Sequence, residues 1–180
     1  MADFRGTVAE AITDIGLVQI TTNRLELPAA NLPGGAAAAA KTIFVAAGPG
    51  TDVAAFNEYL AALDDSTSTN AISMRNGAAG AAEVTGLPRS AGGTQPSLNA
   101  GPGSAGAPFR AAFACAAADF ELFVDGVSAA AETFGSMPAV DPTAFHVRGN
   151  PLNASPWADT MFYAAYVPRR VALSDFAVSG

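Results

Sequence analysis

The chain has 180 residues, of which 50% are apolar and only 14% are charged, with a formal net charge of −7. This length suits a single domain that can bury a sizeable core. The excess of 16 acidic over nine basic side chains, with no basic cluster longer than Arg169-Arg170, repels phosphate backbones and excludes DNA or RNA as an expected partner.

The first sixteen residues, MADFRGTVAEAITDIG, have little strand pattern. Four charged side chains interrupt this segment, so it lacks the apolar region of a secretory signal. No later run approaches the length of a membrane span, and membrane insertion is therefore not expected. We predict two parts: residues 1–16, which could serve as an attachment arm, and a domain over 17–180 that is made in a reducing cytoplasm.

The next predicted elements are strands, because short apolar runs end at Gly, Pro, Asn or Asp. GLVQITTNRLELP predicts one or two strands that end at Pro28. KTIFVAAG predicts a strand from Thr42 to Ala47, and its continuous apolar run indicates burial on both faces.

One segment has the spacing of a helix. TDVAAFNEYLAALDD places four large apolar side chains three or four residues apart, with Thr51 or Asp52 as the N-cap. We therefore predict one short helix over residues 52–63, covering an edge or an end of the sheets.

Two further strands and a long loop follow. AISMRNG alternates, with Ile72 and Met74 facing inward and Arg75 facing outward. AAEVTGLP predicts a short strand that ends at Gly86. The stretch from Gly86 to Pro108 is rich in Gly, Pro, Ser and Asn, and predicts a long loop of the kind that is functional or ordered by a neighbour.

The segment FRAAFACAAADFELFVDGVSAAAETF predicts two or three strands, with hairpin turns near Ala118-Asp119 and at Asp125-Gly126. A type I′ turn needs positive φ at both central positions, which Asp tolerates and Gly prefers. In its first strand one parity carries Phe113 and Cys115, while the other carries Ala112, Ala114 and Ala116. That flat alanine face could pack under the second sheet or against another subunit.

The remaining segments complete an all-β chain. AFHVRG and TMFYAAYVP predict strands, the second ended by Pro168, and VALSDFAVSG predicts a final turn and strand. Many short strands with little helix predict an antiparallel two-sheet jelly-roll sandwich with one inserted short helix. Its predicted core includes Phe44, Ile72, Met74, Phe113, Leu122, Val124, Phe145 and Phe162.

Two stretches carry a family resemblance. PFRAAFACAAADFELFVDGVSAA resembles the central hairpin of the laminin-G-like, concanavalin A-like jelly rolls, whose LYVDG phrase appears here as LFVDG over 122–126. MFYAAYVPRRVALSDF resembles the closing strand of that family and its NRALS phrase. The matching places of that phrase are Arg170, Ala172, Leu173 and Ser174. The resemblance spans about 41–179 and implies the same fold, with the predicted helix as an insertion.

The sequence marks no catalytic residue, cofactor or metal site. His146 has the opposite parity to Phe145 and Val147, which predicts a position on a sheet surface or in solvent, and no Gly-x-Ser-x-Gly elbow presents a serine. Cys115 is the only cysteine, which excludes an intramolecular disulfide and favours a small buried residue. A glycan-active enzyme with two carboxylates across a groove stays open as an alternative.

The loop RGNPLNASPWADT offers the best candidate for a binding site. It combines amide and carboxylate side chains with the only tryptophan, and an exposed tryptophan suits stacking on a sugar ring. The alternative is that this tryptophan is buried under the loop as part of the core. The candidate glycan-binding residues are Asn150, Asn153, Trp157 and Asp159.

These features favour a non-enzymatic structural or attachment protein of a virion, such as a bacteriophage head decoration, head fibre or tail protein. The expected partners are other virion proteins or copies of the chain itself, together with a host-surface glycan. The expected location is the virion, after synthesis in the host cytoplasm. The alternative is a free carbohydrate-binding module or lectin-like protein.

Overall fold

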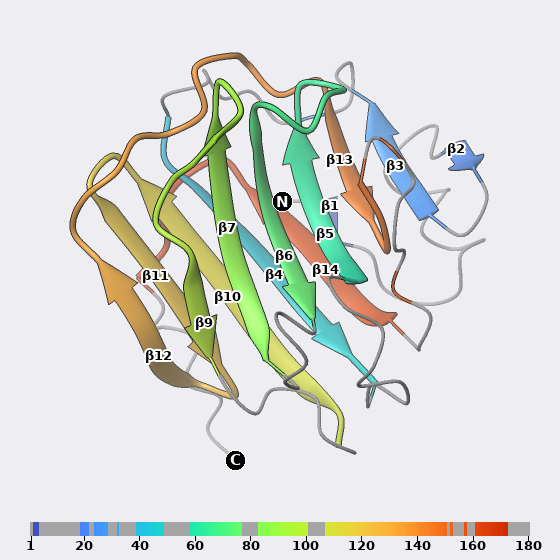
Figure 1. Ribbon diagram of the computed structural model, residues 1–180. Coiled ribbons are helices and arrows are strands. Elements are labelled where there is room, and N and C mark those ends of the chain that lie inside the picture. The colour runs from blue at the N-terminus through green and yellow to red at the C-terminus, as the bar shows by residue number, and fades with distance from the viewer. Residues whose placement is uncertain are drawn as a thin grey trace.

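The computed structural model describes residues 2–3, 19–21, 24–28, 32, 39–48, 58–76, 83–100, 107–150, 152, 157 and 161–172. Within this part the chain forms 14 β-strands in two antiparallel sheets that stack face to face (Figure 1). The described residues include no helix, and therefore none that is long and apolar enough to cross a membrane. The predicted two-sheet jelly-roll sandwich is confirmed.

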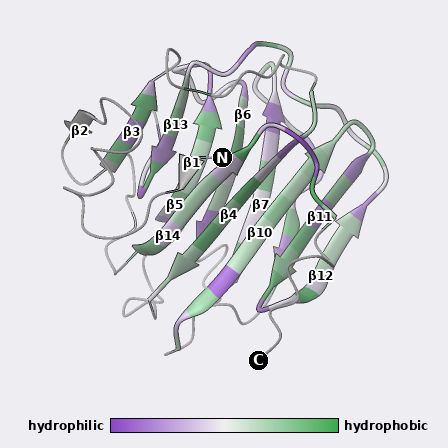
Figure 2. Cartoon of the chain, turned by 180° about the vertical axis from the view of Figure 1, so that it is seen from behind, coloured by the Kyte–Doolittle hydropathy of each residue, from purple (hydrophilic) through white to green (hydrophobic). Residues whose placement is uncertain are grey.

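The six-stranded sheet, called sheet A, has the order β1-β14-β4-β10-β11-β12. Its strands are β1 (Ala2–Asp3), β14 (Met161–Val167), β4 (Lys41–Ala47), β10 (Phe109–Ala116), β11 (Asp119–Val124) and β12 (Val127–Glu132). The central strand β4 is buried along nearly its whole length, as its continuous apolar run predicts. Figure 2 views the molecule from the side of sheet A and shows this apolar character along β4.

The eight-stranded sheet, called sheet B, has the order β2-β3-β13-β5-β6-β7-β8, and β9 also pairs with β7. Its strands are β2 (Gln19–Thr21), β3 (Arg24–Pro28), β13 (Ala144–Val147), β5 (Glu58–Asp64), β6 (Ala71–Asn76), β7 (Val84–Ser90), β8 (Gly93–Thr94) and β9 (Leu98–Ala100). The predicted strands before Pro28 are confirmed as the pair β2 and β3.

The main core fills the space between the sheets. Five predicted core side chains are almost inaccessible to solvent: Ile72, Met74, Phe113, Leu122 and Phe145. Val124 is partly buried against this core. The prediction that Phe162 belongs to the core is wrong, because its side chain is 55% exposed. The register of β14 against β4 shifts between Met161 and Tyr163, so the bulge turns Phe162 outward.

A second apolar cluster covers the outer side of sheet A. It contains Phe44, Ala112, Ala114, Ala165 and Val167. Phe44 is thus buried as predicted, but on the opposite face of the sheet from the main core. The alanine parity of β10 belongs to this cluster, whereas its Phe113 and Cys115 parity faces the main core, so the two faces of β10 divide as the sequence predicts.

The residues after β14 form a C-terminal strap (residues 168–172) bound to sheet A. The Thr42 hydroxyl donates to the carbonyl oxygen of Arg169 at 2.8 Å and accepts from the backbone N–H of Val171 at 2.9 Å. Arg170 pairs through Nε with Asp119 at 2.6 Å and through Nη2 with Glu121 at 3.0 Å, both on β11. The strap thereby connects β4 with β11, two strands away in the sheet order.

The predicted hairpin turns in this region are confirmed. Ala118 has a φ of 54°, and Asp125 and Gly126 have φ of 50° and 80°. The two positive angles at Asp125-Gly126 are those of a type I′ turn, and a side chain at Gly126 would meet nothing within 4 Å. Glycine therefore serves the backbone conformation here rather than close packing.

The predicted helix over 52–63 is wrong where the structure describes it, because Glu58–Asp64 form strand β5 between β13 and β6. A register shift between Tyr59 and Ala61 turns two consecutive residues, Leu60 and Ala61, toward the core. This bulge produces apolar positions three apart, at Leu60 and Leu63, which imitate helical spacing. Residues 52–57 lie outside the described residues.

The predicted loop over 86–108 is also wrong, since it contains the second half of β7 and the short strands β8 and β9. Gly86 does not end β7. An added Cβ at this position would lie 2.6 Å from Cδ2 of Phe113. The strand needs glycine here because its backbone passes directly over the buried Phe113 ring.

The predicted division at residue 16 stays a prediction. Ala2 and Asp3, inside the predicted arm, pair as β1 with Tyr166 and Ala165 of β14 at the edge of sheet A. The rest of the predicted arm lies outside the described residues.

Candidate functional site

The outer face of sheet B carries polar side chains in transverse rows, because antiparallel register aligns residues of equal parity across the strands. The first row, called the polar row, consists of Tyr59 on β5, Arg75 on β6, Thr85 on β7 and Asn99 on β9. Neighbouring strands lie ~4.8 Å apart, so the four positions span ~14 Å. Sheet B faces the viewer in Figure 1, with β5, β6, β7 and β9 side by side.

Tyr59 and Arg75 form one end of the polar row. The Arg75 guanidinium carbon lies 4.3 Å from the centroid of the Tyr59 ring, a cation–π contact. Burial lowers the pKa of Arg75 from its ordinary value, while Tyr59 opposes this shift and the like charge of Arg89 adds to it. This contact holds the guanidinium over the ring, and its planar set of donors suits a planar acceptor such as a carboxylate.

The other end of the polar row is a hydroxyl and an amide. Thr85 is buried and its Oγ1 donates to Oδ1 of Asn99 at 2.9 Å. Asn99 is exposed, and its amide nitrogen has no hydrogen bond to any residue that the structure describes. This orientation leaves two N–H donors available to a hydroxyl-rich ligand.

The rest of this face divides into a cationic and an acidic half. Arg89 on β7 donates from Nη1 to the carbonyl oxygen of Ser68 at 3.3 Å. Within the described residues, no carboxylate pairs with Arg75 or Arg89. The acidic half, on β3 and β5, holds Glu26 and Asp64. A protein of net charge −7 thus keeps two unneutralised arginines on one half of a single face.

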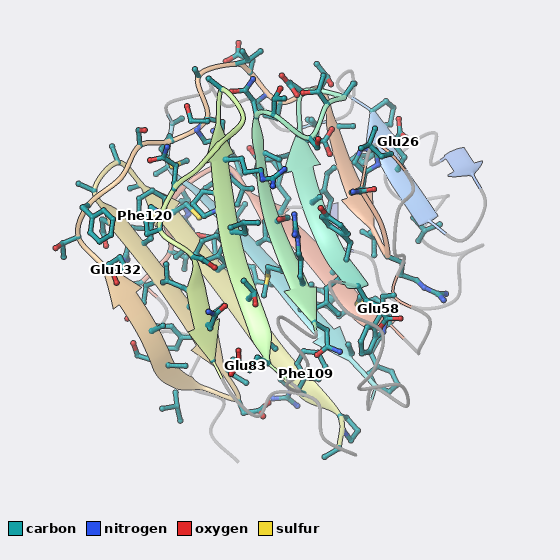
Figure 3. All side chains as sticks on the ribbon, viewed as in Figure 1. Glu26, Glu58, Glu83, Phe109, Phe120 and Glu132 are labelled. Carbon is teal, nitrogen blue, oxygen red and sulfur yellow. The ribbon has the colours of Figure 1, made fainter. Side chains whose placement is uncertain are left out.

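His146 lies in the acidic half, buried between the two carboxylates. Its Nε2 is 3.1 Å from Oδ2 of Asp64 and its Nδ1 is 3.5 Å from Oε2 of Glu26, which Figure 3 labels over β3. Neither approach has the angle of a hydrogen bond. Burial raises the pKa of Asp64, and interaction with His146 opposes that rise.

This environment decides what His146 can do. The predicted position on a sheet surface is correct, but solvent does not reach it, because the side chain is only 2% exposed. Glu26 and Asp64 flank a buried imidazole instead of an open groove. Among the described residues, no group of three or more His, Cys, Asp or Glu side chains could hold a metal ion.

The loop residues predicted to bind glycan are placed differently. Trp157 is fully buried, with its ring edge-on to Phe109 at 6.1 Å between centroids. The backbone N–H of Trp157 donates to the backbone carbonyl oxygen of Tyr59 at 3.3 Å. The backbone carbonyl oxygen of Trp157 accepts from Nε of Arg148 at 3.0 Å. Asn150 is also buried. The core alternative for Trp157 agrees with this placement, while Asn153 and Asp159 lie outside the described residues.

The polar row was not predicted from the sequence as a site. The alternation in AISMRNG does predict that the Arg75 side chain faces outward. Tyr59, however, fell within the predicted helix and Asn99 within the predicted loop, so neither could be assigned to a sheet face. The row depends on the pairing of four strands, which local sequence does not specify.

The structure confirms the prediction that Cys115 is a small buried residue. The side chain is fully buried in the main core, and burial raises the pKa of its thiol well above the ordinary value. A protonated, inaccessible thiol is a poor nucleophile.

Comparison with known proteins gives the fold. No protein-family model and no curated protein matches the sequence. The structure is similar to the Ruminococcus gnavus IT-sialidase CBM40 bound to α2,6 sialyllactose, with a TM-score of 0.62 and 15% identity over 80% of this chain and 85% of that chain. It is similar to domains LG4-5 of the mouse laminin α1 chain, with a TM-score of 0.59 and 8% identity over 84% of this chain and 40% of that chain.

A third similar structure is that of botulinum neurotoxin type C, whose cell entry depends on interaction with two ganglioside molecules. Its TM-score is 0.60, with 8% identity over 86% of this chain and 38% of that chain. Identities this low show the fold alone. The resemblance to laminin-G-like jelly rolls is thereby confirmed as a resemblance of fold.

Proposed function

We propose that this chain is a non-enzymatic glycan-binding module that holds its ligand on the polar row of sheet B. The observation that carries the proposal is the Arg75 guanidinium stacked on Tyr59 with no carboxylate partner among the described residues. Thr85 and Asn99 continue the same row with hydroxyl and amide groups. A few fixed polar groups beside an aromatic ring suit a sugar, which presents both C–H faces and hydroxyls.

An acidic glycan suits this face best. Arg75 offers bidentate donors for a carboxylate, and Arg89 adds a second positive charge on the same face. The similar CBM40 module binds sialyllactose and the similar neurotoxin interacts with gangliosides, which supports the same class of ligand for this chain. The buried positions of His146 and Cys115 support a binding rather than a catalytic role.

Arg75→Gln is expected to lower the affinity for an acidic oligosaccharide about 10- to 100-fold, because a hydrogen bond to a charged group contributes ~1.5–3 kcal/mol. A glycan array would identify the ligand, and isothermal titration calorimetry would measure the affinity of each variant. Increasing salt should weaken wild-type binding, since the attraction is partly ionic.

The matched control is Arg110→Gln, which removes the same charge from an exposed position on sheet A. It should leave the affinity unchanged. Equal affinity of the wild type and Arg75→Gln would place the sugar elsewhere, and absence of any bound glycan would contradict the proposal.

A narrower form of the proposal is that the module serves as an attachment protein on a bacteriophage particle. The acidic, lysine-poor composition supports it, since such surfaces stay soluble at high copy number. Deletion of residues 2–16 is then expected to give a folded chain that no longer joins the particle, as measured by copurification with virions. Normal incorporation of the truncated chain would reject an anchoring role for this segment.

A further inference from the structure

Arg75 on β6 and Arg89 on β7 place two like charges on neighbouring strands of one face. Thr85 is the register partner of Arg75, and Arg89 lies four residues further along β7, which is ~13 Å in the strand direction. Both arginines are half-buried, and neither is paired with a carboxylate among the described residues. Their mutual repulsion is therefore not relieved by an ion pair within this part of the chain.

Each of these two guanidinium groups keeps hydrogen-bond donors available. The Nε atoms of Arg75 and Arg89 are both buried, and neither bonds to any residue that the structure describes. Each group is nevertheless held in place, Arg75 by the Tyr59 ring and Arg89 by the carbonyl oxygen of Ser68. A buried donor without an acceptor is unfavourable, so both positions suit a ligand that presents acceptors.

The charges around the two arginines define a direction. Ser73 and Leu87 are register partners between the levels of Arg75 and Arg89, and neither carries a charge. In the opposite direction Glu83, labelled in Figure 3, immediately precedes β7. The acidic half of the face lies beyond β6, on β3 and β5. An acidic ligand that contacts Arg75 is therefore attracted toward Arg89 along β6 and β7, and is repelled by the other two directions.

We propose that the module binds an acidic oligosaccharide along β6 and β7, with one acidic group at Arg75 and a second at Arg89. The ~13 Å between their levels is the length of about two or three sugar rings, so the two acidic groups belong to neighbouring or alternate residues of the ligand. This inference rests on the proposed glycan binding. It adds a second subsite, at Arg89, and a minimum length that a monosaccharide does not reach.

The electrostatic coupling of the two arginines supports one ligand that spans both. Burial is the largest cause that lowers the pKa of Arg75, and the positive charge of Arg89 lowers it further. A ligand with a single acidic group would neutralise one guanidinium and leave the other unpaired. Two acidic groups would neutralise both, each through charge-assisted hydrogen bonds to a planar set of donors.

Calorimetry with galacturonic acid and trigalacturonic acid tests the second subsite. The wild type should bind the trimer about 10- to 100-fold more tightly than the monomer, because a second charge-assisted contact forms. A protein with one subsite would gain only about threefold, from the number of carboxylates alone. Added salt should weaken trimer binding more steeply than monomer binding. A glycan array with pairs that differ by one acidic residue extends the comparison to other sugars.

Arg89→Gln identifies the residue of the second subsite. It should lower the affinity for the trimer about 10- to 100-fold, but the affinity for the monomer by less than about threefold, and it should remove the extra salt dependence. Arg75→Gln should weaken the binding of both sugars. Arg110→Gln, on the exposed side of sheet A, should change neither. A loss confined to the longer ligand separates a lost subsite from a damaged fold, which would weaken both.

Three results would overturn the second subsite. They are a wild type that binds monomer and trimer about equally, an Arg89→Gln variant that keeps the full affinity for the trimer, and equal binding of triglutamic acid, whose three side-chain carboxylates are not on a sugar. In each case the proposed glycan binding still holds if Arg75→Gln weakens the binding of an acidic sugar. A protein that binds no glycan on the array contradicts the proposed function itself.

Discussion

Gly86→Ala is expected to lower the free energy of unfolding by about 1–3 kcal/mol, the cost of overpacking a filled core. The new Cβ would lie 2.6 Å from Cδ2 and 2.7 Å from Cε2 of Phe113. Phe113 is completely buried on β10, so its ring cannot turn toward solvent to make room. Either the two sheets separate locally or the ring leaves its rotamer, and both changes weaken the packing between β7 and β10.

Thermal unfolding followed by circular dichroism would measure this effect, since each kcal/mol should shift Tm by about 2–4 °C in a chain of this size. Gly93→Ala is the matched control, because its Cβ would meet only the Ser90 carbonyl oxygen at 3.4 Å. The double variant Gly86→Ala/Phe113→Leu should lose less stability than the sum of the single variants. Strict additivity would show that the strain does not come from the Phe113 ring.

Trp157→Ala is expected to lower the free energy of unfolding by about 3–5 kcal/mol, as truncation of a large buried aromatic side chain does. The indole is fully buried in the main core and packs edge-on against Phe109. The backbone of Trp157 also donates to the carbonyl oxygen of Tyr59 and accepts from Nε of Arg148. Loss of the ring therefore leaves a cavity in the main core, at a residue whose backbone bonds Tyr59 of the polar row.

Urea unfolding at a fixed pH would measure this loss, with circular dichroism as the signal because the variant lacks the only tryptophan. Trp157→Phe should recover part of the stability by keeping an aromatic contact with Phe109. Phe162→Ala removes a ring that is 55% exposed and should change stability by less than about 0.5 kcal/mol. A Trp157→Ala protein of normal stability that fails to bind sugar would support the exposed, stacking role of this residue instead.

The strands that could be predicted have local signals. The Asp125-Gly126 turn is specified by two residues that accept positive φ, and β4 by a continuous apolar run. Strand β5 could not be predicted, because its bulge gives apolar residues the spacing of a helix. Gly86 appears in the sequence as a strand end, and only Phe113 on a distant strand explains its presence within β7. The polar row combines four strands, so it follows from tertiary register rather than from any single motif.

The position of β4 at the centre of sheet A determines when the protein can fold during synthesis. Val45 pairs with Ala111 on one side and with Ala164 on the other, so both neighbours of β4 are made long after it. Such distant pairing slows folding, because the chain must close large loops before any contact compensates for the lost entropy. A ribosome that has just made β4 exposes the apolar segment KTIFVAA with no partner strand. Sheet A is completed only after β14 has been made, and until then this exposed apolar segment is prone to aggregation.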